Sequence, residues 1–152
     1  MSKSVKRVRA AAQALGLDIT VQEMPDSTRT AVEAAAACGV TLDQIVKSLI
    51  FTAGDGLHLF LVAGGNTLDL DTAARAVGSD LTRADADRVR RETGFAIGGV
   101  APIGHLAPVP VWFDPRLLDF ETVVAVAGTP RHVFSVAPQI LRDATGANLL
   151  PR

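Results

Sequence analysis

The chain has 152 residues, 48% of them hydrophobic and 20% charged, which fits a single globular domain over residues 1–152. Lys and Arg number 15 and Asp and Glu 16, so the net charge of −1 predicts neither a disordered chain nor a general attraction to nucleic acid. The longest strongly apolar stretches, 59–63 and 123–127, are far shorter than the roughly 20 residues of a membrane-spanning helix. With no secretory signal pattern at its start, the sequence predicts a cytoplasmic protein without a membrane partner.

The first 45 residues predict two helices around a short strand, followed by one more short helix. Apolar residues recur at steps of three and four over 4–15, ahead of Gly16, which is typical of an amphipathic helix. The alternation over 18–24 favours a strand. A capping-box pattern begins at Thr30 before an alanine-rich helix, and it is repeated at Thr41 for the short helix.

The strongest strand signal is a β-hairpin over residues 47–63. The stretches KSLIFTA and LHLFLVAG flank Gly-Asp-Gly, which is typical of a tight turn between two strands. This hairpin is expected to be central to a sheet. Helices are predicted over 70–77 and 83–93, because each run ends at a glycine suited to a helix C-terminus.

The remaining third predicts a loop, three strands and a final helix. Residues 95–110 are rich in Gly and Pro and lead into the strand VPVWF, while ETVVAVAG and RHVFSVA flank the turn Gly128-Thr-Pro. The last helix is expected from Pro138 to about Ala144. Helices precede, interrupt and follow strands, so the predicted class is α+β, with a mixed sheet or partial barrel flanked by helices.

Lys47 is the first candidate functional residue, because the two-residue period of a strand puts it on the same face as Leu49 and Phe51. A lysine beside bulky apolar residues either extends outward to water or offers its ammonium to an anion at the rim of a pocket. The second candidate is the loop Gly98-Gly-Val-Ala-Pro102, whose glycines can turn N–H groups towards one ligand atom, although a simple turn is the alternative.

Other familiar sites are missing from the sequence. It has no Gly-x-Ser-x-Gly elbow and no His-Glu-x-x-His motif, and its single Cys38 and three scattered histidines predict neither a metal site nor a cofactor. Cys38 is expected to be a small buried thiol. His105 is expected to be solvated, and Asp69 is expected to cap a helix. Local basic residues that could contact RNA gather at Lys3, Lys6, Arg7 and Arg9.

The order of motifs resembles the YbaK/prolyl-tRNA-synthetase-associated domain family over nearly the whole chain. The motifs are Lys47-Ser-Leu-Ile-Phe, Leu68-Asp-Leu, residues 93–105 and Gly128-Thr-Pro. Members are aminoacyl-tRNA deacylases with a highly twisted mixed sheet, in which a strand lysine and a Gly-x-x-x-Pro loop line the pocket. The resemblance implies a catalytic Lys47 and a substrate-binding set of Ser48, Gly98, Gly99, Val100, Ala101, Pro102, Gly128 and Thr129.

The implied function is trans-editing, in which a small wrong amino acid is hydrolysed from the acceptor end of tRNA(Pro), with prolyl-tRNA synthetase as a second candidate partner. An aminoacyl ester is already activated, so positioned water and main-chain N–H groups can replace a catalytic triad. Alanine, serine, threonine, cysteine and 2-aminobutyrate remain open as the amino acid removed, and residues 24–30 are expected to help close its pocket. The alternatives are a non-catalytic tRNA-binding or regulatory module and a hydrolase of small esters. Oligomeric state is left open.

Overall fold

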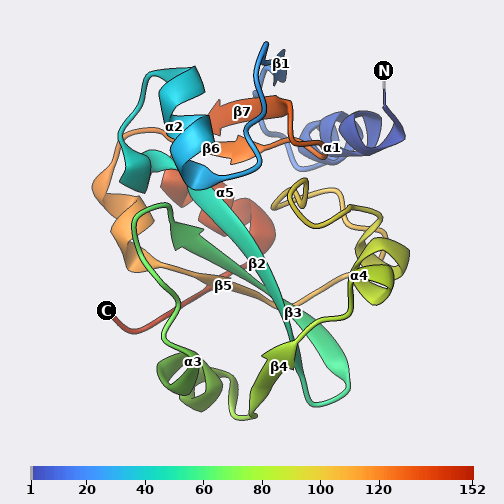
Figure 1. The fold of residues 1–152 in the computed structure, drawn as a ribbon, viewed down its shortest axis with the longest axis vertical. Helices are drawn as coiled ribbons and strands as arrows, with labels where there is room; N and C mark the ends of the chain where they lie inside the picture. The colour runs from blue at the N-terminus through green and yellow to red at the C-terminus, as the bar shows by residue number, and fades with distance from the viewer. Residues whose placement is uncertain (1) are drawn as a thin grey trace.

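The computed structural model describes residues 2–152, in which helices and strands follow one another irregularly (Figure 1), and the predicted α+β class is confirmed. The helices are α1 (Lys3–Ala14), α2 (Ala31–Cys38), α3 (Leu70–Val77), α4 (Ala86–Thr93) and α5 (Pro138–Thr145), with 3-10 helices η1 (Leu42–Gln44) and η2 (Pro115–Asp119). The strands are β1 (Gln22–Glu23), β2 (Val46–Ala53), β3 (Gly56–Ala63), β4 (Leu81–Arg83), β5 (Val111–Phe113), β6 (Val123–Val126), β7 (His132–Val136) and β8 (Asn148–Leu149).

The strands form two sheets that meet near the start of β2. The larger sheet has the order β4-β2-β3-β5-β8, in which β2 and β3 form the predicted antiparallel hairpin and β5 and β8 add in parallel. The smaller, antiparallel sheet has the order β1-β7-β6. An isolated bridge between Ile45 and Val124 links the two. The hairpin therefore crosses the molecule from α3 and β4 to the smaller sheet (Figure 1).

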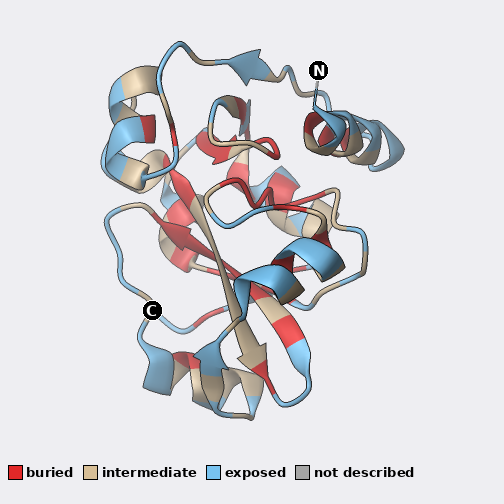
Figure 2. Ribbon diagram, turned by 45° about the vertical axis from the view of Figure 1, so that its right-hand side comes forward, coloured by how far each residue is buried: buried red, intermediate tan, exposed pale blue. Residues whose placement is uncertain are grey.

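The two faces of the hairpin are buried against different clusters, as the alternation of its residues predicts. Leu49 and Phe51 pack on the side of α3 with Phe60 and Val62. Ile50 faces the main core, which also holds the fully buried side chains Leu59, Leu61, Phe95, Phe113 and Phe134. Figure 2 shows buried residues concentrated along the central strands and exposed residues on the outer surfaces of the helices.

Two predicted elements differ from the structure. The strand expected over 18–24 is reduced to β1, because only these two residues pair with β7. The helix expected over 83–93 begins at residue 86, and residue 83 instead ends β4, which pairs with β2. Asp85 accepts a hydrogen bond from the N–H of Arg88 and fixes the start of α4. In both cases the pairing with a strand distant in the sequence sets the bounds of the element. The local pattern of charged and apolar residues does not indicate that pairing.

One edge of β2 is only partly covered. β4 pairs with Phe51, Thr52 and Ala53, so in the described part of the chain residues 46–50 have no strand partner on that side. In an antiparallel ladder alternate residues direct their N–H and C=O groups away from the partner strand. The first half of β2 therefore presents free backbone donors and acceptors along an open edge.

Candidate functional site

Two cavities lie near the end of the hairpin where β2 begins and β3 ends. The first, here called the edge cavity, has a volume of about 500 Å³ and is walled by residues 28–31, 45–49 and 97–98 with Val100 and Val126. The second, here called the linker cavity, has about 390 Å³ and is walled mainly by the β3–α3 linker, η2 and residues 150–152. Both volumes suit a small molecule or the end of a larger one.

Charge distinguishes the two cavities. The edge cavity is lined by two cationic side chains, Lys47 and Arg29, and by no carboxylate, while its other walls are small or apolar. The linker cavity is lined by two acids that accept main-chain hydrogen bonds and by two bases paired with acids outside the cavity: Asp69, Asp114, Arg116 and Arg152. Only the edge cavity has uncompensated charge, so it is the better site for an anionic or electron-rich ligand.

Lys47 lies half-buried in the second position of β2, on the open edge of the strand. Its ammonium donates a hydrogen bond to the main-chain carbonyl of Asn66, in the linker that follows β3. The side chain of Lys47 therefore neither extends freely into water nor leaves its ammonium entirely to a ligand, because the carbonyl of Asn66 holds the charge beside the cavity. An ammonium has three donors, so two remain for a ligand oxygen or water.

The glycine loop, residues 98–102, forms another part of the wall through Gly98 and Val100. Gly98 has a φ of +94°, which favours glycine, and a methyl group there would lie 3.0 Å from Cγ of Arg29. The N–H of Gly99 donates to the carbonyl of Ala96 at 2.9 Å. Within residues 2–152 the N–H groups of Gly98 and Val100 have no hydrogen-bond acceptor, which leaves two main-chain donors at the cavity wall.

The other predicted site residues divide into two groups. Ser48 lines the edge cavity, and its buried Oγ has no hydrogen-bond partner among the described residues, so rotation of its side chain would offer a hydroxyl to a ligand. Ala101 and Pro102 are buried behind the loop. Gly128 and Thr129 lie outside the cavity wall, but a methyl group on Gly99 would meet Cα of Thr129 at 3.1 Å. This turn therefore supports the loop from behind.

Several wall residues were not predicted individually. The segment expected to close the pocket supplies Thr28, Arg29 and Thr30, and Thr28 is anchored by a 2.6 Å hydrogen bond from Oγ1 to the carbonyl of Pro130. Arg29 is exposed and packs over Gly98. Val126 comes from β6 of the smaller sheet. Only the folded arrangement brings these three segments to β2, and no spacing in the sequence indicates it.

Arg7 and His105 both hold the glycine loop from the side away from the cavity. Arg7 donates from Nη2 to the carbonyl of Gly94 at 2.7 Å and from Nε to that of Gly104 at 3.2 Å. Arg7, one of the four basic residues that could contact RNA, is half-buried, whereas Lys3, Lys6 and Arg9 are exposed.

His105 is not solvated as expected, because the loop folds its ring against Phe95. The ring centroids are 5.1 Å apart, Nε2 lies 2.6 Å from the carbonyl of Ala101, and the buried Nδ1 has no partner among residues 2–152. Burial, reinforced by the charge of Arg7, lowers the pKa of His105 despite the hydrogen bond to Ala101. We therefore assign the neutral ring, with Nε2–H donating to Ala101.

The lowered pKa predicts a pH-dependent stability. Below the ordinary histidine pKa of about 6.5 the unfolded chain binds a proton that the folded ring resists, so the free energy of unfolding falls as the pH drops from there towards the depressed value. Urea unfolding between pH 8 and pH 5 should show a shallower decline for His105→Gln than for the wild type. Some decline should persist in the variant, because burial also lowers the pKa of His58. Parallel curves would contradict the assignment.

The other candidate groups have structural roles. Asp69 accepts hydrogen bonds from two N–H groups and the hydroxyl of Thr72 at the start of α3, which confirms it as a cap and holds the pKa of its carboxyl below the usual range. Cys38 is half-buried at the end of α2, and burial raises the pKa of its thiol.

Across residues 2–152, no three His, Cys, Asp or Glu side chains gather as a metal site. None of the helices in this range is long and apolar enough to cross a membrane.

Comparison with known proteins gives concordant results. The model of a family described as "Aminoacyl-tRNA editing domain" matches residues 25–144. A solved structure described as that of a candidate trans-editing enzyme for prolyl tRNA synthetase is 48% identical, with a TM-score of 0.93 over 98% of this chain and 96% of that one.

Two curated relatives are more distant. The uncharacterized protein YwhH of Bacillus subtilis (strain 168) is 30% identical over 141 residues, 92% of this chain and 90% of that protein. The proline–tRNA ligase of Shouchella clausii is also 30% identical, over 91% of this chain. The chain spans only 24% of that ligase, so the match concerns one part of a larger enzyme.

Proposed function

Because this chain belongs to the aminoacyl-tRNA editing domain family, we propose that it is a trans-editing deacylase that removes a small non-cognate amino acid from mischarged tRNA(Pro). The observation that carries the proposal is the edge cavity, whose lining includes Lys47, Arg29 and two residues with unpaired main-chain N–H groups but no carboxylate. Such a site favours the phosphate and ester oxygens of a tRNA end, and it does not supply a protein general base.

The reaction is the hydrolysis of an ester. A water oxygen adds to the ester carbonyl, the bond to the ribose oxygen then breaks, and the products are the free amino acid and the intact 3′ end. In this proposal the free N–H groups of Gly98 and Val100 stabilise the negative charge that develops on the carbonyl oxygen. Lys47 supplies a positive charge at the same cavity. A ribose hydroxyl of the substrate can orient the water, which agrees with the lack of a triad.

The walls favour a small amino acid. Ala31, Val100 and Val126 leave apolar surface of limited size, and Gly98 keeps the loop close to Arg29. A synthetase pocket gains only about 1–3 kcal/mol per methylene, so a proline enzyme cannot reject smaller amino acids by binding alone. A second, hydrolytic site with close-fitting walls can admit those residues and exclude the rigid pyrrolidine ring.

The test is a deacylation panel on one tRNA(Pro) charged separately with alanine, serine, threonine, cysteine, 2-aminobutyrate and proline. We expect rapid release of at least one small amino acid and no release of proline above the spontaneous rate. Prolyl ester hydrolysis as fast as that of every small amino acid would end the editing proposal. Binding of tRNA without any turnover would favour a non-catalytic module, and equal activity on free amino-acid esters would favour a general esterase.

A further inference from the structure

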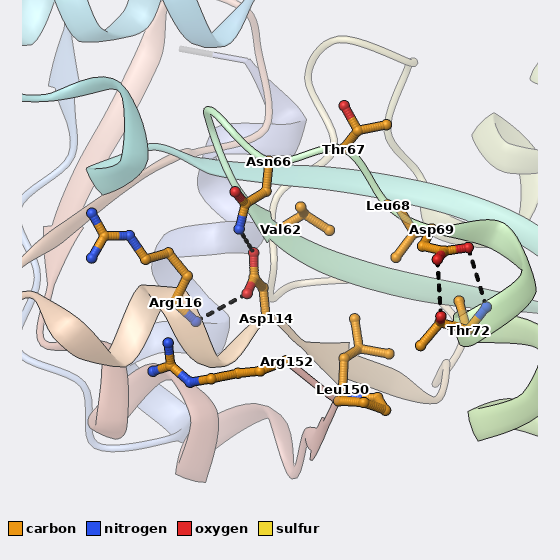
Figure 3. Close-up of a pocket in the computed structure, with 12 residues that line it drawn as sticks. Val62, Asn66, Thr67, Leu68, Asp69, Thr72, Asp114, Arg116, Leu150 and Arg152 are labelled. Atoms are coloured by element: carbon orange, nitrogen blue, oxygen red, sulfur yellow. Dashed lines mark hydrogen bonds between the residues drawn. The ribbon is translucent and has the colours of Figure 1, made fainter.

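We propose that Asn66 and Asp114 are positioning residues that fix the ammonium of Lys47, an inference that rests on the proposed deacylase function and extends it beyond the edge cavity. Neither residue lines that cavity; both line the linker cavity (Figure 3). Their link to the site is the main-chain carbonyl of Asn66, which accepts the hydrogen bond from Lys47.

Asp114 joins three segments through one carboxylate. Its Oδ2 accepts hydrogen bonds from the N–H of Ala63 at 3.0 Å and from Nδ2 of Asn66 at 2.9 Å, while Oδ1 accepts from the N–H of Arg116 at 2.9 Å. Figure 3 shows the side chains of Asn66 and Asp114 pointing towards each other. The end of β3, the linker and the start of η2 are thereby tied at one point, and the N–H of Asn66 adds a 2.9 Å hydrogen bond to the carbonyl of Ala63.

The two residues before Asn66, Gly64 and Gly65, are also held in place by contacts with other segments. Gly65 donates its N–H to Oδ1 of Asp43 at 2.8 Å, and Oδ2 of the same carboxylate accepts from Nε of Arg116 at 3.1 Å. A methyl group on Gly64 would lie 2.1 Å from the carbonyl oxygen of Leu42, so the linker approaches η1 more closely than any side chain allows. The Asn66 carbonyl is therefore presented by a rigid turn although Asn66 itself is exposed.

Rigidity at this carbonyl has a consequence for catalysis. A lysine side chain has four rotatable bonds and on an open strand edge would sample many positions. A fixed acceptor selects one of them and leaves two N–H donors directed elsewhere, available for substrate oxygens. Misplacing such a group by about 1 Å can cost as much as 10²-fold in rate, so the tie between Asn66 and Asp114 should affect turnover more than binding.

The decisive variant is Asn66→Ala, because it removes the side-chain bond to Asp114 and keeps the main-chain carbonyl that Lys47 uses. We expect kcat for the best substrate to fall roughly 10-fold, with KM changed less than about 2-fold and the thermal midpoint close to that of the wild type. The matched control is Thr67→Ala, the next exposed residue of the linker, which should keep wild-type kinetics. Asp114→Asn should also lower kcat but destabilise the fold, since it disturbs the cap of η2.

A double-mutant cycle separates positioning from a general structural effect. If Asn66 acts through Lys47, then Asn66→Ala should cause no further loss in a Lys47→Ala background. An equal fold-loss in both backgrounds, or wild-type kcat for Asn66→Ala alone, would overturn the inference while leaving the deacylase function intact. Full activity of Lys47→Ala would overturn it as well.

If the wild type deacylates nothing, the proposed function is refuted, and the positioning of Lys47 must be tested without an activity assay. The NMR signal of its ammonium provides such a test. In ¹⁵N-lysine-labelled protein, an ammonium held by a fixed carbonyl should give an Nζ signal protected from exchange, assigned by its loss in Lys47→Ala. This signal should persist in Thr67→Ala and broaden or disappear in Asn66→Ala. An unchanged signal in Asn66→Ala would show that the tie to Asp114 does not position Lys47.

Discussion

A Lys47→Ala variant is expected to fold like the wild type and to lose about 10²- to 10³-fold in deacylation kcat/KM, the usual cost of removing one preorganised stabilising group. Lys47 is one of two cations at the edge cavity, and it lies in the part of β2 that β4 does not cover. Its removal leaves this part of the wall without charge, so the transition state should lose stabilisation while the apolar walls remain.

The same substitution should have little effect on stability. Lys47 is half-buried and has one hydrogen bond to protein, from its ammonium to Asn66, whose loss should cost about 1 kcal/mol. Lys47→Met, which keeps most of the stem without the charge, should show the same loss of activity and separate charge from packing. Arg91→Ala on the exposed face of α4, outside the basic group of α1, is the control. Turnover near the wild-type rate in both Lys47 variants would remove this residue from the site.

Much of the hairpin and of its chemistry was predictable because the signals are local. Alternating residues and a Gly-Asp-Gly turn determine β2 and β3, and the same alternation places Lys47 on a face with Leu49 and Phe51, which do pack together. Helix ends at Gly39, Gly78 and Gly94 were predictable for a similar reason, since each adopts a positive φ.

The short strands, the open edge of β2 and the contact of Asn66 with Asp114 were not predictable, because they depend on contacts between segments distant in the sequence. Residues 22–23 and 148–149 are strands only because β7 and β5 pair with them. The open edge of β2 exists because β4 stops at Phe51, and this is what makes a cavity beside Lys47. Asn66 and Asp114 gave no signal in the sequence because an exposed asparagine and a helix-capping aspartate are ordinary when each is considered alone.

The basic residues of α1 have two different roles. Lys3, Lys6 and Arg9 point outward and are available to a phosphate backbone, whereas Arg7 lies on the inner side of α1 against the glycine loop. Its guanidinium lies 4.8 Å from the ring centroid of Phe95, which is fully buried. Helical periodicity places Arg7 on one face with Ser4 and Ala11, but it does not show which carbonyls the side chain reaches.

Arg7→Met is therefore expected to destabilise the protein by about 2–4 kcal/mol, because it removes charge-assisted hydrogen bonds and a cation–π contact together. The carbonyls of Gly94 and Gly104 lose a donor at both ends of the loop, and methionine fills the space without replacing it. Since the loop carries the free N–H groups of the edge cavity, deacylation should fall with its order. Arg7→Lys should recover little, because an ammonium cannot make the same forked contact.

Urea unfolding and amide hydrogen exchange are the measurements that test this role. The midpoint should move to lower urea in Arg7→Met, and exchange should accelerate over residues 94–104 more than in the β2–β3 hairpin. Arg9→Met, on the exposed side of the same helix, is the control and should leave both unchanged. Equal midpoints for the two variants would show that the loop is held by His105 and the Gly128–Thr129 turn alone. In that case the inward turn of Arg7 would contribute to neither stability nor the site.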